Sequence, residues 1–376
     1  MFGKGIKLAR IFGIEIWIDY SWLIIFVLVM WTLSKGFFPS QYPGLTGGTY
    51  FLMGIVSALT LFASVLLHEL SHSYVAQRSG IPVPRITLFV FGGVAQIAEE
   101  PRSARDEFNI AIAGPICSIT LAAVFWLLSK LPALAGDVRW VAIMSYLAYV
   151  NLALVVFNMI PGFPLDGGRV LRAYLWNKWE NVKKATYTVS KIGSGFGTGL
   201  IVFGGFNVLV GNIIGGVWLI FIGMFLNTAA KSGYQMAVLK DTLKGVRVSD
   251  VMTRDPVTVS PDLSIADLVR DFFYQHKFVS FPVVGTMGEF LGIVSLNHVR
   301  DIPQSEWSAR TVGEVMATPP QIKTLSPDDD AMTALGYIIA DELGRVPVLS
   351  SDGRVVGIIT RRDIMTLLTI KTDLGF

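Results

Sequence analysis

The residues best suited to chemistry stand together in one apolar stretch of the chain. His68 and His72 are four positions apart, so on a helix their side chains lie on one face, a single turn from each other. Two neutral imidazoles at that spacing can bind one zinc ion. Glu69 follows the first histidine, where a carboxylate can take a proton from zinc-bound water. The spacing therefore predicts a metal site that activates water.

The element that must position these residues is predicted to lie inside a membrane. From Tyr50 to Tyr74 the chain is almost wholly apolar and long enough to cross a bilayer as a helix. The H-E-x-x-H pattern is short and also arises by chance in soluble proteins. Two histidines and a glutamate inside an apolar span are harder to explain as packing, because ionisable side chains at that depth are costly.

Composition indicates a membrane protein with a soluble extension. Of the 376 residues, 52% are hydrophobic and 16% are charged, and the mean hydropathy is +0.55. Long apolar runs dominate up to Gly233, whereas the chain after Lys240 has the composition of a soluble α/β domain. The formal net charge of +3 gives no indication of a nucleic-acid partner, and the lone Cys117 excludes an intrachain disulfide.

Six membrane spans are predicted, and the lipid bilayer is the expected environment of this part. With the N-terminus in the cytoplasm, the cytoplasmic segments 1–16, 78–109 and 161–191 carry 13 Lys and Arg residues, against three on the opposite side. The positive-inside rule therefore predicts a multi-pass protein of the cell membrane with both termini in the cytoplasm. The expected spans are Trp17–Leu33, Tyr50–Gln77, Ile110–Ser129, Trp140–Ile160, Ile192–Val210 and Ile213–Ala230.

The segment from Arg85 to Glu100 differs from its surroundings because it is rich in β-branched and aromatic residues. Gly92 and Gly93 stand at its centre and predict a turn or a bulge. A re-entrant hairpin backed by protein is permitted at membrane depth, and an exposed edge strand in Phe89–Ile97 could pair with an extended peptide. The alternative is an ordinary hairpin at the membrane surface.

A second polar stretch ends the fourth predicted span. Pro161 and Pro164 break the helix, and neighbouring glycines permit a tight turn that can bring Asp166 back beside the two histidines. An aspartate would complete a set of two histidines and one carboxylate, leaving the fourth position for water. Asn158 can donate its amide hydrogens to a carbonyl oxygen. An ordinary turn at the membrane exit is the alternative explanation for this composition.

The two polar stretches, taken together and in this order, form a pattern that is much more specific than either stretch alone. His68-Glu69-Leu-Ser-His72 in an apolar span, followed by Asn158-x-x-Pro161-x-x-x-Leu165-Asp166-Gly167, resembles the site-2 protease family of intramembrane zinc metalloproteases. The resemblance covers roughly residues 1–230 and implies one zinc ion per chain and a single-span membrane protein as substrate. The implied roles are zinc ligation by His68, His72 and Asp166, acid/base catalysis by Glu69, and substrate contact by Asn158 and by the loop with Gly92 and Gly93.

The last third of the chain contains an internal repeat. Val248-Ser-Asp-Val-Met252 returns as Val312-Gly-Glu-Val-Met316, and each unit is predicted to contain the order strand, helix, strand, strand, helix. The repeat resembles a tandem pair of CBS domains, which often bind adenine nucleotides through a Ser/Thr-x-x-Asp signature. The second repeat has this signature as Thr360 and Asp363, whereas the first has Ser295 followed by His298. A purely structural module that forms a homodimer is the alternative.

The predicted fold is a polytopic α-helical membrane domain of about six spans with a re-entrant β-hairpin, followed by a soluble α/β tandem CBS module. The expected domains are a zinc protease domain at 1–235, a linker at 236–247, and CBS domains at 248–304 and 311–370. The predicted function is cleavage of a transmembrane segment of a regulatory protein, controlled by an adenine nucleotide at the CBS pair. A CBS-gated transporter or channel without protease activity is the alternative, but it would need ionisable residues spread along a pore.

Overall fold

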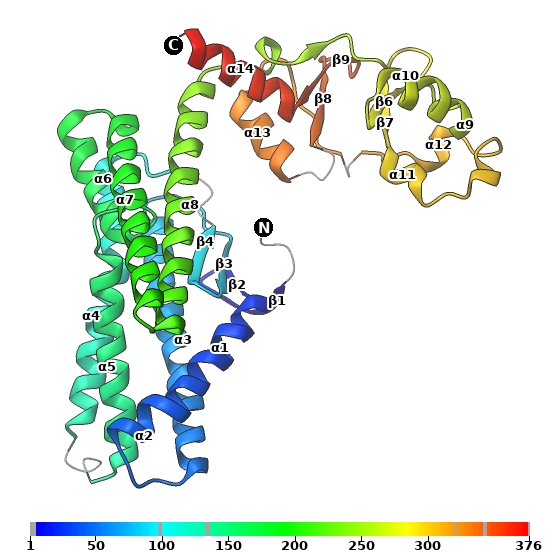
Figure 1. Cartoon of the computed structure of the whole chain (residues 1–376). Coiled ribbons are helices and arrows are strands. Elements are labelled where there is room, and N and C mark those ends of the chain that lie inside the picture. Colours follow the sequence, from blue (N-terminus) through cyan, green and yellow to red (C-terminus); the bar gives the residue numbers. More distant parts are fainter. Residues whose placement is uncertain (1–4, 97–99, 132–135, 320–321, 341–343, 375–376) are drawn as a thin grey trace. The chain divides into compact units, whose positions relative to one another are not determined.

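A computed structural model describes residues 5–96, 100–131, 136–319, 322–340 and 344–374 (Figure 1). The chain divides into two compact units, Met1–Gln235 and Met236–Phe376. The first unit contains the apolar spans and the second contains the internal repeat, so each unit is described by itself.

The first unit is built on long apolar helices. Six helices within the described ranges are long and apolar enough to cross a membrane, which confirms the expected number of spans. A shorter helix, α6 at Asp166–Trp179, lies where the sequence predicts only a turn. The six are Tyr20–Gln41 (α1 at Tyr20–Thr32, a π-helical segment at Leu33–Phe37 and α2 at Phe38–Gln41), α3 at Gly47–Arg78, α4 at Ala104–Ser129, α5 at Val138–Asn158, α7 at Val182–Leu209, and Ile213–Lys240 within α8 at Ile213–Leu243.

A four-stranded sheet accompanies these helices, in the order β1-β2-β3-β4. Its strands are β1 at Gly5–Ile11, β2 at Ile14–Asp19, β3 at Arg85–Phe89 and β4 at Gly92–Gln96. The β3–β4 hairpin confirms the predicted strands, but its turn is Val90–Phe91 and both glycines pair in register with β3. The prediction of a turn or a bulge at Gly92 and Gly93 is therefore wrong. These glycines instead begin β4. Ile97, the end of the predicted peptide-pairing stretch, lies outside the described residues.

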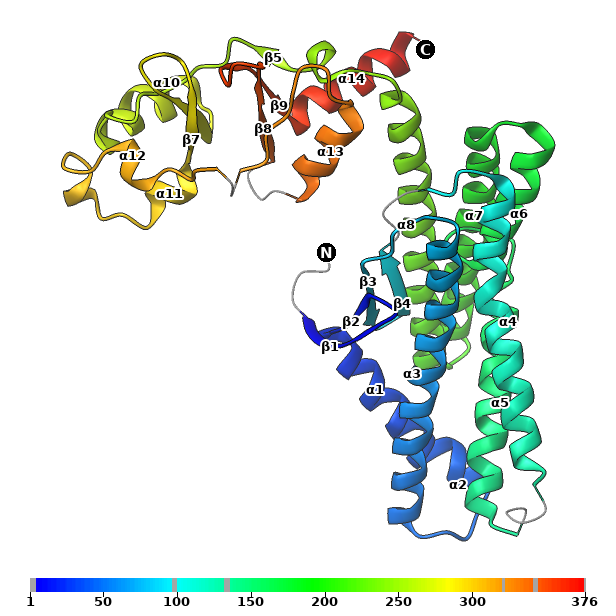
Figure 2. The ribbon, with the colours of Figure 1, turned by 180° about the vertical axis from the view of Figure 1, so that it is seen from behind.

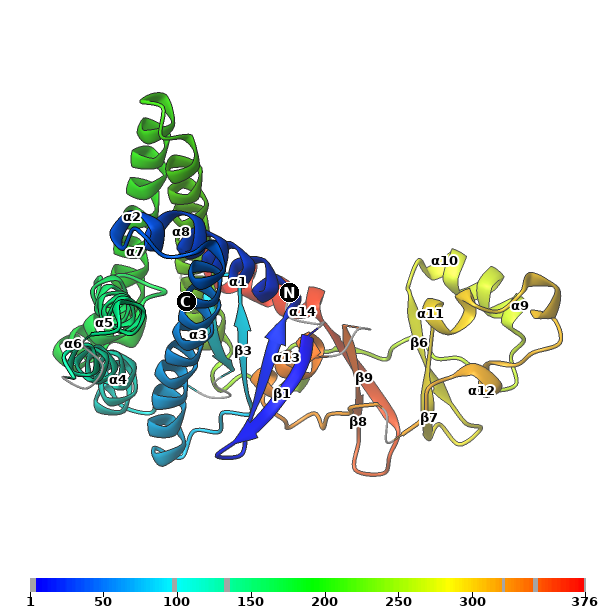
Figure 3. The ribbon, with the colours of Figure 1, turned by 90° about the horizontal axis from the view of Figure 1, so that it is seen from below.

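The hairpin of β1 and β2 has no counterpart in the sequence prediction. Strand β2 runs parallel to β3 and pairs Ile16 with Ile86, so two segments about 70 residues apart in sequence are joined. Ile14 and Ile16 are fully buried, and they pack against Leu70 of α3. Figure 3 shows the strands beside α3. The sheet is thus anchored on the helix that carries the two histidines. The re-entrant position of the β3–β4 hairpin depends on where the bilayer lies and stays a prediction.

The connection between α5 and α6 is a tight turn that depends on glycine. Pro161 cannot continue α5, and the chain folds back through hydrogen bonds from the Gly162 amide to the Ile160 carbonyl (2.8 Å) and from Leu165 to Gly162 (3.1 Å). A Cβ on Gly167 would clash with the carbonyl group of Met159, so only glycine permits this approach. The turn starts α6 at Asp166, as the predicted return of this residue requires.

The second unit contains two similar halves, each with its own hydrophobic core. Figure 2 shows β7 in one half and β8 and β9 in the other. The first half contains a 3-10 turn at Val248–Asp250, β5 at Thr253–Arg254, α9 at Ile265–Asp267, a π-helical segment at Leu268–Phe273, α10 at Tyr274–His276, β6 at Ser280–Val284, β7 at Phe290–Ser295, α11 at Leu296–Arg300, a 3-10 turn at Gln304–Glu306 and α12 at Val312–Val315. The second contains α13 at Ala331–Ala340, β8 at Arg345–Leu349, β9 at Val355–Thr360 and α14 at Arg361–Leu374.

One strand joins the two halves, because β5 at the start of the first pairs with β9 of the second. The segment expected as a linker, 236–247, is helical as far as Leu243, and the Leu243 side chain is fully buried in the core of the second half.

Candidate active site

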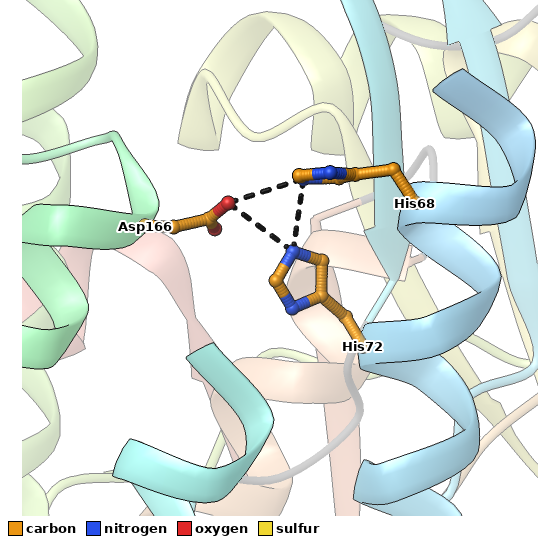
Figure 4. A group of neighbouring side chains, drawn as sticks. All are labelled: His68, His72 and Asp166. Carbon is orange, nitrogen blue, oxygen red and sulfur yellow. Dashed lines mark hydrogen bonds and ion pairs between the residues drawn. The ribbon is translucent and has the colours of Figure 1, made fainter. Parts of the chain in front are cut away.

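His68, His72 and Asp166 converge from two helices on one point of the first unit. His68 and His72 lie one turn apart on α3, and Asp166 is the first residue of α6 (Figure 4). The Asp166 carboxylate Oδ2 is 3.1 Å from Nε2 of His68 and 3.3 Å from Nε2 of His72, and the two Nε2 atoms are 3.2 Å apart. The structure thus brings together the three residues predicted as metal ligands.

The far side of each imidazole ring is held by helix α4. His72 donates from Nδ1 to the carbonyl oxygen of Ile110 at 2.6 Å, and His68 Nδ1 is 2.9 Å from the hydroxyl oxygen of Ser118. A carbonyl oxygen can only accept, so the proton of neutral His72 is on Nδ1 and the Nε2 lone pair faces the centre of the group. Both rings are almost fully buried, at 3% and 4% exposure. Both imidazole rings are therefore held in orientation by contacts on the side opposite their Nε2 atoms.

The donor set suits a zinc ion. Ligand atoms about 2.0–2.1 Å from a tetrahedrally coordinated zinc are roughly 3.3 Å from one another. The three separations between Nε2, Nε2 and Oδ2 lie between 3.1 and 3.3 Å, so an ion fits among them without a change in side-chain position. Two imidazoles and one carboxylate are also the ligand types that zinc enzymes use while leaving a position for water. His68, His72 and Asp166 could therefore hold zinc.

Two glycines give the site its space. A Cβ built on Gly114 of α4 would lie against Nε2 of both His68 and His72, within the volume that an ion must occupy. A Cβ built on Gly93 of β4 would be 2.5 Å from Cγ of Glu69, whose side chain is half-buried beside the histidines. Glycine at both positions permits the backbone to approach the reactive groups closely.

A buried ion pair joins the two helices that complete the site. Arg172 of α6 donates from Nε to Oε1 of Glu107 on α4 at 2.6 Å, and the Glu107 side chain is fully buried. Arg172 lies six residues after Asp166, and Glu107 lies near the start of the helix that supports both histidines. The pair therefore fixes α6, and with it Asp166, against the helix that orients the other two ligands.

Two residues predicted to contact the substrate, Asn158 and Gly92, are not hydrogen-bonded to the metal-binding side chains within the described ranges. Asn158 is the last residue of α5. Gly92 begins β4 with a φ of 128°, a backbone conformation that favours glycine. Gly114 and Ser118 are parts of the site that the sequence did not predict. Their spacing from Ile110, four and eight residues on one helical face, was the available signal.

Comparison with known proteins identifies the family. The sequence profile of peptidase family M50 matches residues 56–134 and 128–203, and that of the CBS domain matches 248–304 and 312–370. The candidate zinc metalloprotease Rip3 of Mycobacterium tuberculosis is 35% identical over 97% of this chain and 93% of its own length. The chain belongs to peptidase family M50. It is therefore a zinc metalloendopeptidase of the site-2 protease type and a multi-pass membrane protein.

Another relative also matches this chain over nearly its full length. A zinc metalloprotease of Methanocaldococcus jannaschii is 31% identical over 98% of this chain and 98% of its own length. Among solved structures, a site-2 protease from the same organism is 30% identical, covers 61% of this chain and 95% of its own, and gives a TM-score of 0.42. The membership of this chain in the M50 family excludes the alternative of a transporter or channel without protease activity.

The residues predicted to bind a nucleotide lie at the start of α14. The Thr360 hydroxyl donates to Oδ2 of Asp363 at 2.6 Å, and the Thr360 amide donates to the same oxygen at 2.8 Å. The hydroxyl of Thr253 donates to the other carboxylate oxygen at 3.1 Å. Thr360 and Asp363 therefore already cap the helix, a role that does not require a ligand.

Polar atoms without partners lie in the corresponding region of the first repeat and at the adjoining start of β8. Within the described residues, no hydrogen-bond partner is found for the Ser280 and Ser295 hydroxyls, Nδ1 of His298 or Nε of Arg345. Ser280 and Ser295 are directly opposite each other on β6 and β7, and Arg345 donates from its guanidinium to the Ser280 carbonyl at 3.3 Å. Burial lowers the pKa of the His298 imidazole. These unpaired groups are the kind that a polar ligand satisfies.

Proposed function

We propose that this chain is an intramembrane endopeptidase that cleaves the transmembrane segment of a single-span regulatory protein. The observation that carries this proposal is the group of His68, His72 and Asp166 with the Glu69 carboxylate beside it, all on helices within the apolar unit. His68 lies ten residues before the end of α3 at Arg78, which is about 15 Å along the helix axis. We infer that the site lies within the bilayer, nearer the cytoplasmic face.

In this proposal His68, His72 and Asp166 hold one zinc ion, which when bound supplies a Lewis acid and activates water. Glu69 takes a proton from the attacking water as the water oxygen bonds to the peptide carbonyl carbon. The carbon–nitrogen bond then breaks, and Glu69 passes the proton to the leaving amine. Asn158 donates an amide hydrogen to the carbonyl oxygen on which negative charge develops.

The edge strand β4 supports a specific mode of substrate binding. In a two-residue hairpin the pair that flanks the turn, Phe89 and Gly92, is hydrogen-bonded, and such pairs alternate along the strands. The backbone groups of Gly93 and Ala95 therefore point away from β3, toward the open edge of the sheet. An extended peptide paired with them would pass Glu69, because Gly93 lies against that side chain. A helix buries its scissile amides, so the substrate segment must unwind locally.

Two variants test the catalytic proposal in purified full-length protein reconstituted with a single-span substrate. Glu69→Gln should retain about one zinc ion per chain and lose cleavage by roughly 10²–10⁴-fold, because a general acid/base contributes that much. Asp166→Ala should lose both zinc and cleavage, as one of three ligands is removed. Normal cleavage by Glu69→Gln would contradict the assignment of Glu69. Full zinc content in Asp166→Ala would mean that another residue is the third ligand.

We also propose that the CBS pair binds an adenine nucleotide and thereby changes the rate of cleavage. The unpaired polar atoms of Ser280, Ser295, His298 and Arg345 support this proposal, because a ligand with phosphate and ribose oxygens would satisfy them. Arg345 is directly opposite Thr360 in the pairing of β8 with β9, so these groups adjoin the second-repeat pair of Thr360 and Asp363. The sign of the effect depends on which state the nucleotide binds more tightly.

Calorimetric titration of the full-length protein with AMP, ADP and ATP tests the nucleotide proposal. Asp363→Ala removes a helix cap as well as a ligand contact, so His298→Ala provides a second variant that leaves α14 capped. Both variants should bind more weakly than wild type. If wild type bound none of the three nucleotides, the remaining proposal for the module would be homodimer formation.

We propose further that both termini lie in the cytoplasm, as the distribution of Lys and Arg favours. The test is protease protection of tags placed at either end, in sealed membrane vesicles of known orientation. If either tag were digested only by protease on the extracytoplasmic side of the membrane, this orientation would be contradicted.

A further inference from the structure

A pocket of about 520 Å³ lies between α7 and α8, away from the zinc-binding group. Its lining residues are neutral or basic, and no carboxylate lines it in the described part of the chain. They are Tyr187, Ser190, Lys191, Ser194, Gly195, Thr198, Lys231 and Tyr234. Two lysines with no acidic residue beside them give this pocket a positive potential, which attracts anions.

The polar groups of the pocket are available to a ligand. Lys191 and Lys231 are exposed, and no ion pair to either is found within the described ranges. Ser190 is only 5% exposed, yet its hydroxyl has no hydrogen-bond partner among the described residues. Other hydroxyls of the same helix donate to the carbonyl one turn earlier, as Thr186 does to Val182 at 2.7 Å. An unpaired buried hydroxyl beside two lysines indicates that an external acceptor belongs there.

The position of the pocket along the two spans identifies the source of that acceptor. The connection between α7 and α8 is at Gly211, whereas the pocket lies toward the opposite ends of both helices. Between the pocket and this connection the helices expose large apolar side chains, including Phe203 and Phe206 of α7 and Phe221 of α8. Such a surface faces lipid chains, and Lys and Tyr are typical of the level of the headgroups.

We propose that this pocket binds the phosphate of an anionic membrane phospholipid. The phosphate is held by the two lysine ammonium groups and by the Ser190 hydroxyl, with the Tyr187 and Tyr234 hydroxyls as further donors. The acyl chains lie along the exposed apolar faces of α7 and α8. Basic pockets between membrane helices recognise anionic headgroups through this combination of charge and hydrogen bonding. The lipid bridges α7 and α8.

The experiment is a titration of full-length protein in nanodiscs of phosphatidylcholine with increasing phosphatidylglycerol, with bound anionic lipid counted by native mass spectrometry. The double variant Lys191→Ala/Lys231→Ala should bind the anionic lipid about thirtyfold more weakly, since each lysine near anionic lipid contributes roughly fivefold. Lys191→Arg/Lys231→Arg should retain binding. The matched control Lys178→Ala/Lys184→Ala removes the same charge from neighbouring exposed positions outside the pocket.

Equal losses in the double variant and in this control would mean that general surface charge attracts the lipid, and would overturn the proposal. Millimolar inorganic phosphate provides a second arm, in nanodiscs of phosphatidylcholine alone. Binding of inorganic phosphate that displaces the lipid would make this a site for free phosphate and would overturn the lipid source. If the double alanine variant failed to fold, Ser190→Ala, which removes only a hydroxyl, should still weaken binding. Unchanged binding by Ser190→Ala would contradict the built site.

Discussion

Gly93 lies against the side chain of Glu69, so that β4 passes directly beside the carboxylate assigned to proton transfer. A Cβ at Gly93 would be 2.5 Å from Cγ of Glu69, closer than side chains in van der Waals contact can approach. Glu69 is in turn next to His68 on α3, which packs against the same sheet. Edge strand β4 and helix α3, which carries both histidines, therefore pack closely against each other at Gly93.

Gly93→Ala should therefore displace the Glu69 carboxylate while leaving the metal ligands in place. We expect cleavage to fall by roughly 10²-fold, because a shift of about 1 Å in a catalytic group can cost that much. Zinc content should remain that of wild type. The control is Gly199→Ala in α7, where a Cβ meets no atom within 4 Å. Wild-type activity of Gly93→Ala would show that Glu69 tolerates the displacement or does not transfer the proton.

The hydroxyl of Ser118 is not one of the proposed metal ligands, yet we expect its removal to weaken zinc binding. It is 2.9 Å from Nδ1 of His68, the ring atom that faces away from the other ligands. Loss of such an outer partner typically weakens zinc binding about 10–100-fold, because the ring is no longer oriented. We expect Ser118→Ala to show that loss in competition with a chelator. Thr120→Ala is the control, since the Thr120 hydroxyl donates only to its own helix, at Ile116. Equal affinities of the two variants would contradict this role.

The parts of the structure that sequence could predict are those governed by local pattern. The spans follow from long apolar runs, and the facing of His68 and His72 follows from the helical repeat alone. The return of Asp166 was also accessible, because Pro161 forces an end to α5 and glycines permit a tight turn.

The parts that were missed depend on contacts between distant segments. Strand β2 is specified by pairing with β3, and the short sequence before Tyr20 has no turn signal strong enough to predict it alone. The turn at Val90–Phe91 was misassigned because glycine more often marks a turn than the first residue of a strand. Likewise, Gly114 and Ser118 acquire their roles only when α4 packs across the histidines.

The buried ion pair of Glu107 and Arg172 should dominate the stability of the helix pair α4 and α6. Glu107→Gln leaves the Arg172 guanidinium without a charged partner in a site with little access to water. Removal of one member of such a pair typically costs about 3–5 kcal/mol in free energy of unfolding. We expect a loss of that size in denaturant unfolding of the purified protein. Asp137→Asn, in the exposed pair with Arg139, should leave the unfolding free energy unchanged. Comparable stability of the two variants would contradict a structural role for the buried pair.

The open edge of β4 gives the sharpest test of how the substrate is held. Proline at Val90 or Val94 would be ambiguous, because the Val90 amide donates to the Ser21 hydroxyl at 3.3 Å and the Val94 amide faces β3. Proline at Ala95 removes an amide that faces the open edge, where proline is tolerated. Ala95→Pro should raise KM about three- to tenfold, the worth of one hydrogen bond, without loss of zinc. Ala95→Val keeps the amide and adds side-chain bulk at the same position, so it should bind substrate more tightly than Ala95→Pro. If the two variants had the same KM, the substrate would not pair with β4 through the amide of Ala95.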